Sequence, residues 1–348
     1  MSLTSQFCHW TAVVLMGMFG VHIAGQDNPA GLSSDCTVYK SVPLPLEAEN
    51  SPTPKSFPAC ASYRSYRGIG LSIDYEKARA CAWQERNAQQ AELAQNEKVP
   101  VAWVVGGSLI FADIYVNGAG VNRNIPLAMR LACESEEPMA ALAAPDIGKL
   151  TTGPARANKH FEFCHYAATT LTMNFCTSYE NEIRDDQRNT YFRSLKKSMS
   201  EQQEVAFEAL LRARKAYIEE HSSEVYQGGT IRGIRTMSSQ EILESLFLSE
   251  LVHFEEKRWP TLSPKEIDGV NALLTGEFER KVEQLKKKNK DDIDEGAVTA
   301  ENLSRVEECW EKFRNAWTTF ASSRYPSQSS AIRAQITLDR YRLVKTIN

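Results

Sequence analysis

The stretch FEFCHYAATTLTMNFC, residues 161–176, places Cys164 and Cys176 twelve positions apart at the head of a long polar segment. A long helix, a second long helix and a shorter one are expected over residues 159–255. The same order of helices recurs, without the cysteine pair, over residues 256–348. The carboxy-terminal half is therefore predicted to form two three-helix bundle-like units in an all-α protein.

Helix-start signals divide the first unit. Its first helix is expected over 159–197. Ser200 and Gln203 then have the spacing of a capping box, in which each side chain satisfies a backbone N–H at the start of a helix. Ser238 and Glu241 have the same spacing and predict the start of the third helix.

The second unit shows similar signals. Ser263 and Pro264 predict the start of its first helix, because proline is tolerated in the first turn. Thr299 is expected to begin the second helix, and Pro326 to break it before a last helix over 332–347. The second helix has an amphipathic stripe with apolar residues three and four apart, which should face a core. The stripe consists of Leu303, Val306, Trp310, Phe313, Trp317 and Phe320.

An internal repeat at an offset of fifty residues marks the region 59–137. Each copy reads as a helix, a Gly-x-Gly turn and a second helix. The glycines permit positive φ angles, the aligned Asp and Asn can cap the second helix, and the aligned alanines let helices approach closely. The aligned pairs are Gly68 with Gly118, Gly70 with Gly120, Leu71 with Val121, Asp74 with Asn124, and Ala78 with Ala128. Because Cys60 and Cys81 lie at similar distances from the first turn, they are expected to form a disulfide.

The amino terminus predicts export. Residues 1–25 contain an apolar run, 10–23, followed by Ala24 and Gly25, which is typical of a secretory signal peptide. A membrane-anchored start is the alternative, because no Lys or Arg precedes the run. The residue directly after Gly25 is not a cysteine, which argues against a lipoprotein. No later apolar stretch approaches the roughly 18 residues of a transmembrane helix, so no membrane association is expected in the mature form.

Composition sets the remaining boundaries and partners. Residues 26–58 are rich in proline and predict an extended tether, and residues 138–158 predict a linker. The formal charge of −4 and pI near 6.0 give no general electrostatic reason to bind nucleic acid. The histidines lack zinc-site spacing, and no nucleophile elbow or phosphate loop is present. The sequence therefore predicts no cofactor, no metal site and no enzyme activity.

Residues 59–137 resemble the Sel-like repeat, a relative of the tetratricopeptide repeat. Tyr115, Gly118, Gly120, Val121 and Ala128 fit its pattern of Tyr, Gly-x-Gly-Val and a small residue. The earlier copy fits less closely, with Tyr66, Gly68, Gly70, Leu71 and Ala78. The resemblance implies a short protein-interaction scaffold; a packed helical hairpin with no partner is the alternative.

The second half resembles the lysozyme inhibitor LprI-like family of bacterial envelope domains. Phe163, Cys164, Ala167, Thr169 and Cys176 fit the opening of its pattern. Later elements of the pattern are matched in the first unit by Leu211, Ala213, Ala216, Tyr217, Gly228, Gly229 and Thr230. A second, degenerate copy is matched by Leu303, Trp310, Phe313, Arg314, Asn315, Thr337 and Arg340.

The resemblance also bears on the cysteines. It implies that Cys164 pairs with Cys176, and the closure of this short loop should contribute roughly 3 kcal/mol. Cys36 and Cys133 remain as candidates to pair with each other. Removal of Cys8 with the signal peptide leaves an odd number of cysteines, and Cys309 is the best candidate for a free thiol.

The implied function is protein binding in the periplasm or outside the cell, with a lysozyme as the partner. The first candidates for contact lie in the glycine-rich loop after the second helix, namely Gly228, Gly229, Thr230, Arg232 and Arg235. A helix connector without a partner is the alternative for this loop. Trp310, Trp317 and Arg314 are expected to belong to the core and its rim. The competing function is a cell-envelope scaffold or assembly factor that binds partners through the Sel-like repeats.

Overall fold

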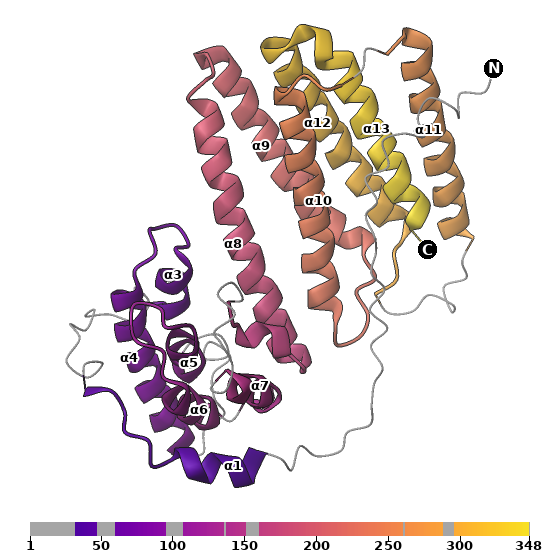
Figure 1. Cartoon of the computed structure of the whole chain (residues 1–348). Helices are drawn as coiled ribbons and strands as arrows, with labels where there is room; N and C mark the ends of the chain where they lie inside the picture. Colours follow the sequence, from indigo (N-terminus) through magenta and orange to yellow (C-terminus); the bar gives the residue numbers. More distant parts are fainter. Residues whose placement is uncertain are drawn as a thin grey trace.

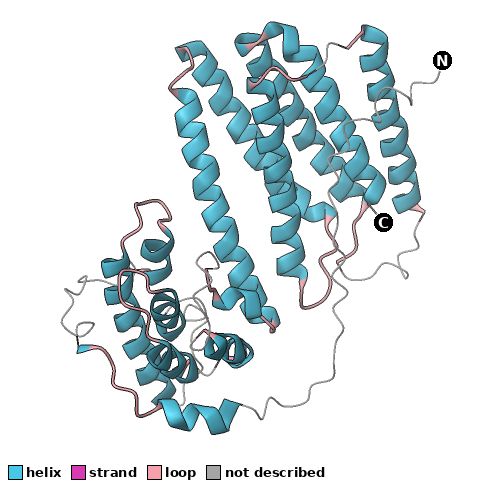
Figure 2. Cartoon of the chain, in the orientation of Figure 1, coloured by secondary structure: helices cyan, strands magenta, loops and turns pink. Residues whose placement is uncertain are grey.

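The structure, a computed structural model, describes residues 32–46, 60–94, 107–135, 137–150, 160–259, 262–287 and 296–347. Every regular element in these residues is a helix, and none of them lies in a strand (Figure 2). This confirms the all-α prediction. The predicted signal peptide, residues 1–25, lies outside the described residues.

The helices before residue 150 gather in one group (Figure 1). They are α1 (Leu32–Tyr39), α3 (Ser62–Arg67), α4 (Tyr75–Ala94), α5 (Gly107–Asn117), α6 (Ile125–Glu134) and α7 (Pro138–Lys149). A short 3-10 helix, η2 (Phe163–Tyr166), leads from this group to α8 (Thr170–Lys196). The long α8 runs from the first group into the second (Figure 1).

The second group is a bundle of longer helices. It contains α8, α9 (Glu201–His221), the 3-10 turn η3 (Ser222–Glu224), α10 (Arg232–Glu255), α11 (Pro264–Lys286), α12 (Ala300–Arg324), the 3-10 turn η5 (Pro326–Gln328) and α13 (Ser329–Thr346). Each group has its own cluster of buried apolar side chains.

The fifty-residue repeat is present in the backbone. Gly68 and Gly118 both have positive φ angles, 73° and 68°, which favour glycine. The N–H of Asp74 donates to the carbonyl of Ser65, and the N–H of Asn124 donates to that of Tyr115, both at 3.0 Å. Those two acceptors are again fifty residues apart. The predicted repeat of a helix, a turn and a helix is therefore a structural repeat.

The aligned polar residues cap the second helix of each copy, as predicted. Asp74 Oδ1 accepts from the N–H of Lys77 at 2.9 Å, and Asn124 Oδ1 accepts from that of Leu127 at 3.1 Å. Cys60 and Cys81 form a disulfide across the first hairpin, with their Cα atoms 5.2 Å apart. The cap and the disulfide fix the direction in which α4 leaves the turn.

Two segments that were predicted to be irregular contain helices. Within the expected tether, α1 is joined to α6 by a disulfide between Cys36 and Cys133, and Tyr39 and Val42 pack against the first core. Within the expected linker, α7 buries four apolar residues: Met139, Ala140, Ala143 and Ile147. Both predictions were wrong for these residues. Helix α1 ends before Pro43, and α7 begins at Pro138, where proline is tolerated, and continues through Pro145 in its interior.

Two predicted helix starts were also wrong. The first long helix begins at Thr170 instead of residue 159, after Thr169 and Thr172 form a capping box. The helix expected to start at Ser238 begins at Arg232, so Ser238 lies inside it. The Glu241 carboxylate does not cap that helix, because it accepts two hydrogen bonds from Arg188 of α8. The capping box predicted at Ser200 and the helix start predicted at Ser263 were correct.

The two predicted three-helix units share one core. All six apolar residues of the α12 stripe are buried, which confirms that prediction. Their partners lie largely on α9 of the first unit: the rings of Tyr217 and Phe313 stack at 5.4 Å, and those of Phe207 and Phe320 lie 5.1 Å apart. The two units are therefore joined, because the broad apolar faces of α9 and α12 pack against each other.

A buried ionic cluster also joins the two units. The guanidinium of Arg340 on α13 is 1% exposed and donates two hydrogen bonds to the Glu224 carboxylate, at 2.7 and 2.6 Å. It donates a third to Glu307 of α12 at 2.9 Å. Burial raises the pKa of both carboxyls, but for Glu224 the charge of Arg340 and the hydrogen bonds with Arg340 and His221 outweigh burial. The pKa of Glu224 therefore lies below its ordinary value, and that of Glu307 lies above it.

A carboxyl pair lies close to this cluster. Burial, the charge of Asp339 and a hydrogen bond with Asp339 raise the pKa of Glu250 well above its ordinary value. Glu250 and Asp339 line a cavity of about 30 Å³ between α10 and α13, together with Arg214 and Arg340. Glu250 is therefore stable in the core as a neutral acid, and its ionisation opposes folding.

Loss of the Arg340 guanidinium should destabilise the bundle strongly. In Arg340→Met, the carboxylates of Glu224 and Glu307 lose their common partner, and such a loss costs about 3–5 kcal/mol. Arg305→Ala is the matched control, because the ion pair of Arg305 with Glu220 joins α12 to α9 at the surface and should contribute under about 1 kcal/mol. Urea unfolding measures both variants, and equal midpoints would contradict this assignment.

Glu250→Gln should stabilise the protein increasingly as the pH rises. The unfolded carboxyl ionises near pH 4.3, at its ordinary pKa, whereas the folded one holds its proton to higher pH. Wild type therefore loses stability, relative to the neutral amide, between those two pKa values. Urea unfolding at pH 4, 6 and 8 should show the difference growing. Glu308→Gln, at an exposed position of α12, is the control; a constant difference for Glu250→Gln would refute the prediction.

Candidate functional site

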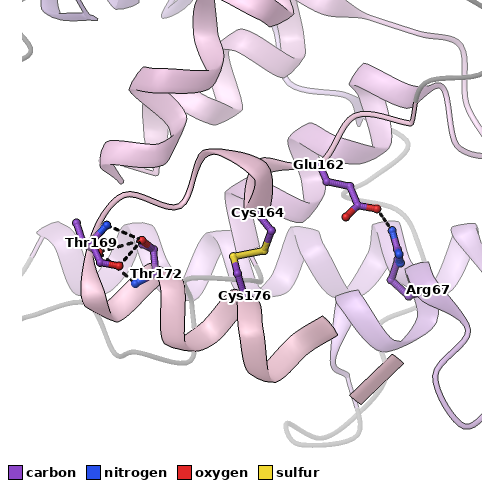
Figure 3. The surroundings of a disulfide bond; sticks show 6 residues. All are labelled: Arg67, Glu162, Cys164, Thr169, Thr172 and Cys176. Carbon is purple, nitrogen blue, oxygen red and sulfur yellow. Dashed lines mark hydrogen bonds and ion pairs between the residues drawn. A yellow bond between two sulfur atoms is a disulfide. The ribbon is translucent and has the colours of Figure 1, made fainter. Parts of the chain in front are cut away.

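The cysteine pair at the head of α8 forms a disulfide. Cys164 in η2 is bonded to Cys176 in the second turn of α8, with their Cα atoms 5.4 Å apart (Figure 3). Beside it, Thr169 and Thr172 exchange hydrogen bonds at the helix start. The bond thus fixes the short segment before α8 against the first turns of that helix.

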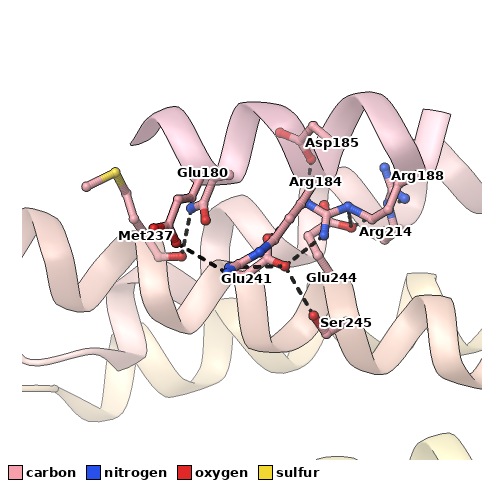
Figure 4. A network of polar contacts seen from close by, with 10 residues as sticks. Glu180, Arg184, Asp185, Arg188, Arg214, Met237, Glu241, Glu244 and Ser245 are labelled. Atoms are coloured by element: carbon pink, nitrogen blue, oxygen red, sulfur yellow. Dashed lines mark hydrogen bonds and ion pairs between the residues drawn. The ribbon is translucent and has the colours of Figure 1, made fainter. Parts of the chain in front are cut away.

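A polar network joins α8 to α10 (Figure 4). The Arg188 guanidinium donates to both carboxylate oxygens of Glu241 at 2.9 Å and to Asp185 at 2.6 Å. The side chain of Arg188 is only 6% exposed. A bidentate pair of this kind fixes the register of two helices. Asp185, which could have served as an acid or base, is committed to this network.

Arg214 of α9 lies beside the same network. Its guanidinium is 5.0 Å from the ring centres of both Phe192 and Phe247, and its Nη1 is 3.4 Å from the Glu244 carboxylate. Burial lowers the pKa of Arg214 and raises that of Glu244. These contacts hold α8, α9 and α10 together. The charged groups of Arg214 and Glu244 are thereby engaged within the bundle.

The structure brings the predicted contact residues together at the lower end of α10 in Figure 1. Gly229, with φ of 80°, and Thr230 are exposed in the turn between η3 and α10. Arg232 and Arg235 lie in the first turn of α10, which begins within the expected loop. The guanidinium of Arg235 donates to the Gly228 carbonyl at 3.2 Å.

Residues next to these candidates complete the surface. Tyr226 is 40% exposed and its ring lies 5.4 Å from the Arg235 guanidinium, and Ile231 is 39% exposed. Gln227 fixes the backbone of the turn, because its N–H donates a hydrogen bond to the carbonyl of Gly296 at 2.7 Å. Gln227 Nε2 also donates to the Ser222 and Val225 carbonyls. We define residues 226–235 as the α10 loop.

The sequence did not single out Tyr226 or Ile231. They flank the glycines that drew attention to the loop, and an aromatic and an aliphatic residue beside two arginines were the available signal. Trp310 and Trp317 are buried, as predicted, and the Arg314 guanidinium lies 4.4 Å from the Trp310 ring centre. Cys309 is a free thiol at a half-buried position.

In the described part of the chain, no group of three or more His, Cys, Asp or Glu side chains is arranged to hold a metal ion. The helices described there also include none that is long and apolar enough to cross a membrane.

Comparison with protein families matches residues 164–252 to the family described as lysozyme inhibitor LprI. The match begins at Cys164 and ends in α10, so it spans the disulfide, the α8–α10 network and the α10 loop. It confirms the resemblance for the first unit. No curated protein and no solved structure matches the chain. The Sel-like character of residues 59–137 and a second family copy over 256–348 stay predictions.

Removal of the α8 disulfide should lower stability without changing the fold. In the double variant Cys164→Ser with Cys176→Ser, the unfolded chain regains the freedom of a short loop, which corresponds to about 3 kcal/mol. Cys309→Ser changes a thiol that forms no disulfide and should leave the urea midpoint close to that of wild type. A double variant as stable as Cys309→Ser would show that the bond contributes nothing.

Proposed function

We propose that this chain is a secreted or periplasmic protein that binds and inhibits a lysozyme. The observation that carries the proposal is the match of the disulfide-pinned segment from η2 to α10 with a family of lysozyme inhibitors. Disulfides persist in oxidising compartments outside the cytoplasm, where lysozymes act. The matched family is one of inhibitors, which supports binding in preference to catalysis.

The α10 loop is the contact surface we propose. It offers an exposed aromatic ring, an exposed aliphatic side chain and two arginines, and Tyr and Arg are enriched among the residues that dominate binding energy. The hydrogen bonds of Gln227 hold its backbone before any partner arrives. Binding to such a preorganised surface requires less ordering of the loop.

The charge of the loop suits the catalytic centre of a glycosidase. These enzymes cleave the sugar chain between two carboxyl groups, and a guanidinium pairs well with carboxylates. Arg235 is engaged with Gly228 and Tyr226. Arg232 is exposed, and it forms no ion pair with any described residue. Arg232 is therefore the side chain that we expect to enter the cleft.

The competing proposal, a scaffold that binds partners through the repeat region, has less support. The surface where α3 and α5 end is covered by residues 160–163 of the same chain. A partner would first have to displace that segment.

Arg232→Ala should weaken inhibition at least about tenfold, the effect of losing one contact worth roughly 1.4 kcal/mol. The assay follows lysis of a peptidoglycan suspension by C-type and G-type lysozymes, with the full chain added in its disulfide-bonded form. Arg212→Ala is the matched control, because Arg212 is exposed on α9 in the same matched segment. It should inhibit as wild type does.

Two results would count against these statements separately. Wild type that gives no protection at micromolar concentration would overturn lysozyme inhibition itself. Wild type and Arg232→Ala that protect equally would leave inhibition in place and exclude Arg232 as the group in the cleft.

A further inference from the structure

Residues 160–163 lie as an extended segment across the ends of α3 and α5. The backbone of Glu162 is extended, with φ of −145° and ψ of 130°. The side chain of Asn117, the last residue of α5, binds both the N–H and the carbonyl of Phe161. Its Oδ1 accepts from the Phe161 N–H at 2.8 Å, and its Nδ2 donates to the Phe161 carbonyl at 2.9 Å. Both hydrogen bonds involve only the backbone of Phe161 and are independent of the side chain at that position.

The first copy of the repeat supplies the matching contact to the next residue. Arg67, the last residue of α3, forms an ion pair with the Glu162 carboxylate (Figure 3). Arg67 and Asn117 are fifty residues apart and therefore occupy equivalent places in the two copies. Tyr66, beside Arg67, forms a hydrogen bond of 3.1 Å with His160 Nε2, and the two rings stack at 5.8 Å. Equivalent helix ends thus hold successive residues of one segment.

The aromatic residues of the segment anchor it in the first core. Phe163 is 3% exposed and belongs to the core cluster of the repeat region, and Phe161 packs against the same cluster. The two rings meet edge to face at 5.0 Å. Backbone and side chains are therefore both recognised along the segment.

This pattern is how proteins hold an extended peptide: hydrogen bonds to the main chain give affinity, and contacts to individual side chains give specificity. We propose that the helix ends of the repeat region form a binding site for an extended peptide with an aromatic–acidic–aromatic sequence, and that residues 161–163 of the same chain occupy it. The site lies apart from the α10 loop and does not depend on lysozyme inhibition.

Occupation by the same chain has a quantitative consequence. A tethered segment competes at an effective concentration of the order of millimolar, so a free peptide of the same sequence should be excluded from wild type. A variant in which the tethered copy has lost its recognised side chains should accept the free peptide.

The test uses a fluorescent peptide with the sequence of residues 159–166, in which Cys164 is replaced by Ser. The full chain carrying Phe161→Ser, Glu162→Ser and Phe163→Ser should bind it at least about tenfold more tightly than wild type, as measured by fluorescence anisotropy. When Arg67→Glu is added to that variant, preference should change to a peptide with Lys at the position of Glu162. A folded variant that binds neither peptide, or that binds both equally, would overturn the proposal.

A second measurement covers the case in which that variant does not fold. In Asn117→Ala, amide hydrogen exchange at Phe161 should accelerate at least about tenfold, while the amides within α6 keep their rates. Asn181→Ala, which removes a long hydrogen bond to the Met237 carbonyl, should leave Phe161 unaffected. Unchanged exchange at Phe161 in Asn117→Ala would show that the Asn117 side chain does not hold the segment and would also overturn the proposal.

Discussion

The packing of α9 against α12 is the contact on which the rest of the bundle depends. It places Phe207 and Tyr217 against Phe320 and Phe313, and thereby makes one core from the helices before and after residue 260. The segment that matches the inhibitor family supplies 8 of the 23 buried apolar residues of this core. The buried pairing of Arg340 with Glu224 adds direction to the contact, since a guanidinium that binds a carboxylate through two hydrogen bonds accepts only one relative placement of its helices.

The α10 loop shows why this dependence matters for function. Its backbone is held by the carbonyl of Gly296, which belongs to the chain beyond the family match. The approach is so close that a Cβ atom on Gly296 would collide with the backbone nitrogen of Gly228. The shape of the proposed contact surface is therefore set in part by residues of the second unit. A fragment limited to residues 164–252 would lack both that support and the α12 side of the core.

Sequence signals succeeded where the cause is local and failed where it is distant. Ser200 and Ser263 cap their helices because the partner lies three residues away. The same spacing at Ser238 was misleading, because Glu241 is used by Arg188, fifty-three residues earlier in the chain. The disposition of two units about one core was likewise invisible, since an amphipathic stripe shows that a face is buried but not which helix covers it.

The predicted site shows the same division. Glycines located the α10 loop, because positive φ at Gly229 is a local requirement. Arg67 and Tyr66 contact Glu162 and His160, which lie about a hundred residues later in the chain. No local sequence spacing predicts contacts at this separation. A signal did exist in the fifty-residue offset, which aligns Arg67 with Asn117. The glycines mark the turns of the repeat, whereas Arg67 and Asn117, directly before those turns, are different residue types and carry no shared pattern.

The two halves of the protein meet along α8, and the contacts there make its placement rigid. At one end, Phe163 is anchored in the repeat region, and the next residue, Cys164, is bonded to α8. Further along α8, the Glu182 carboxylate accepts a hydrogen bond from the Tyr63 hydroxyl at 2.9 Å and pairs with Arg64 at 2.8 Å, so α3 also holds the helix.

Two turns further on, Arg188 binds α10 and the helix enters the bundle. The same helix is thus fixed to the repeat region over its first half and to the inhibitor-like helices over its second half. A change in the contacts of residues 160–163 with α3 and α5 would alter the support of α8 without changing any residue of the α10 loop. The contacts of α8 with α3 and with α10 therefore together set the placement of this helix between the two groups.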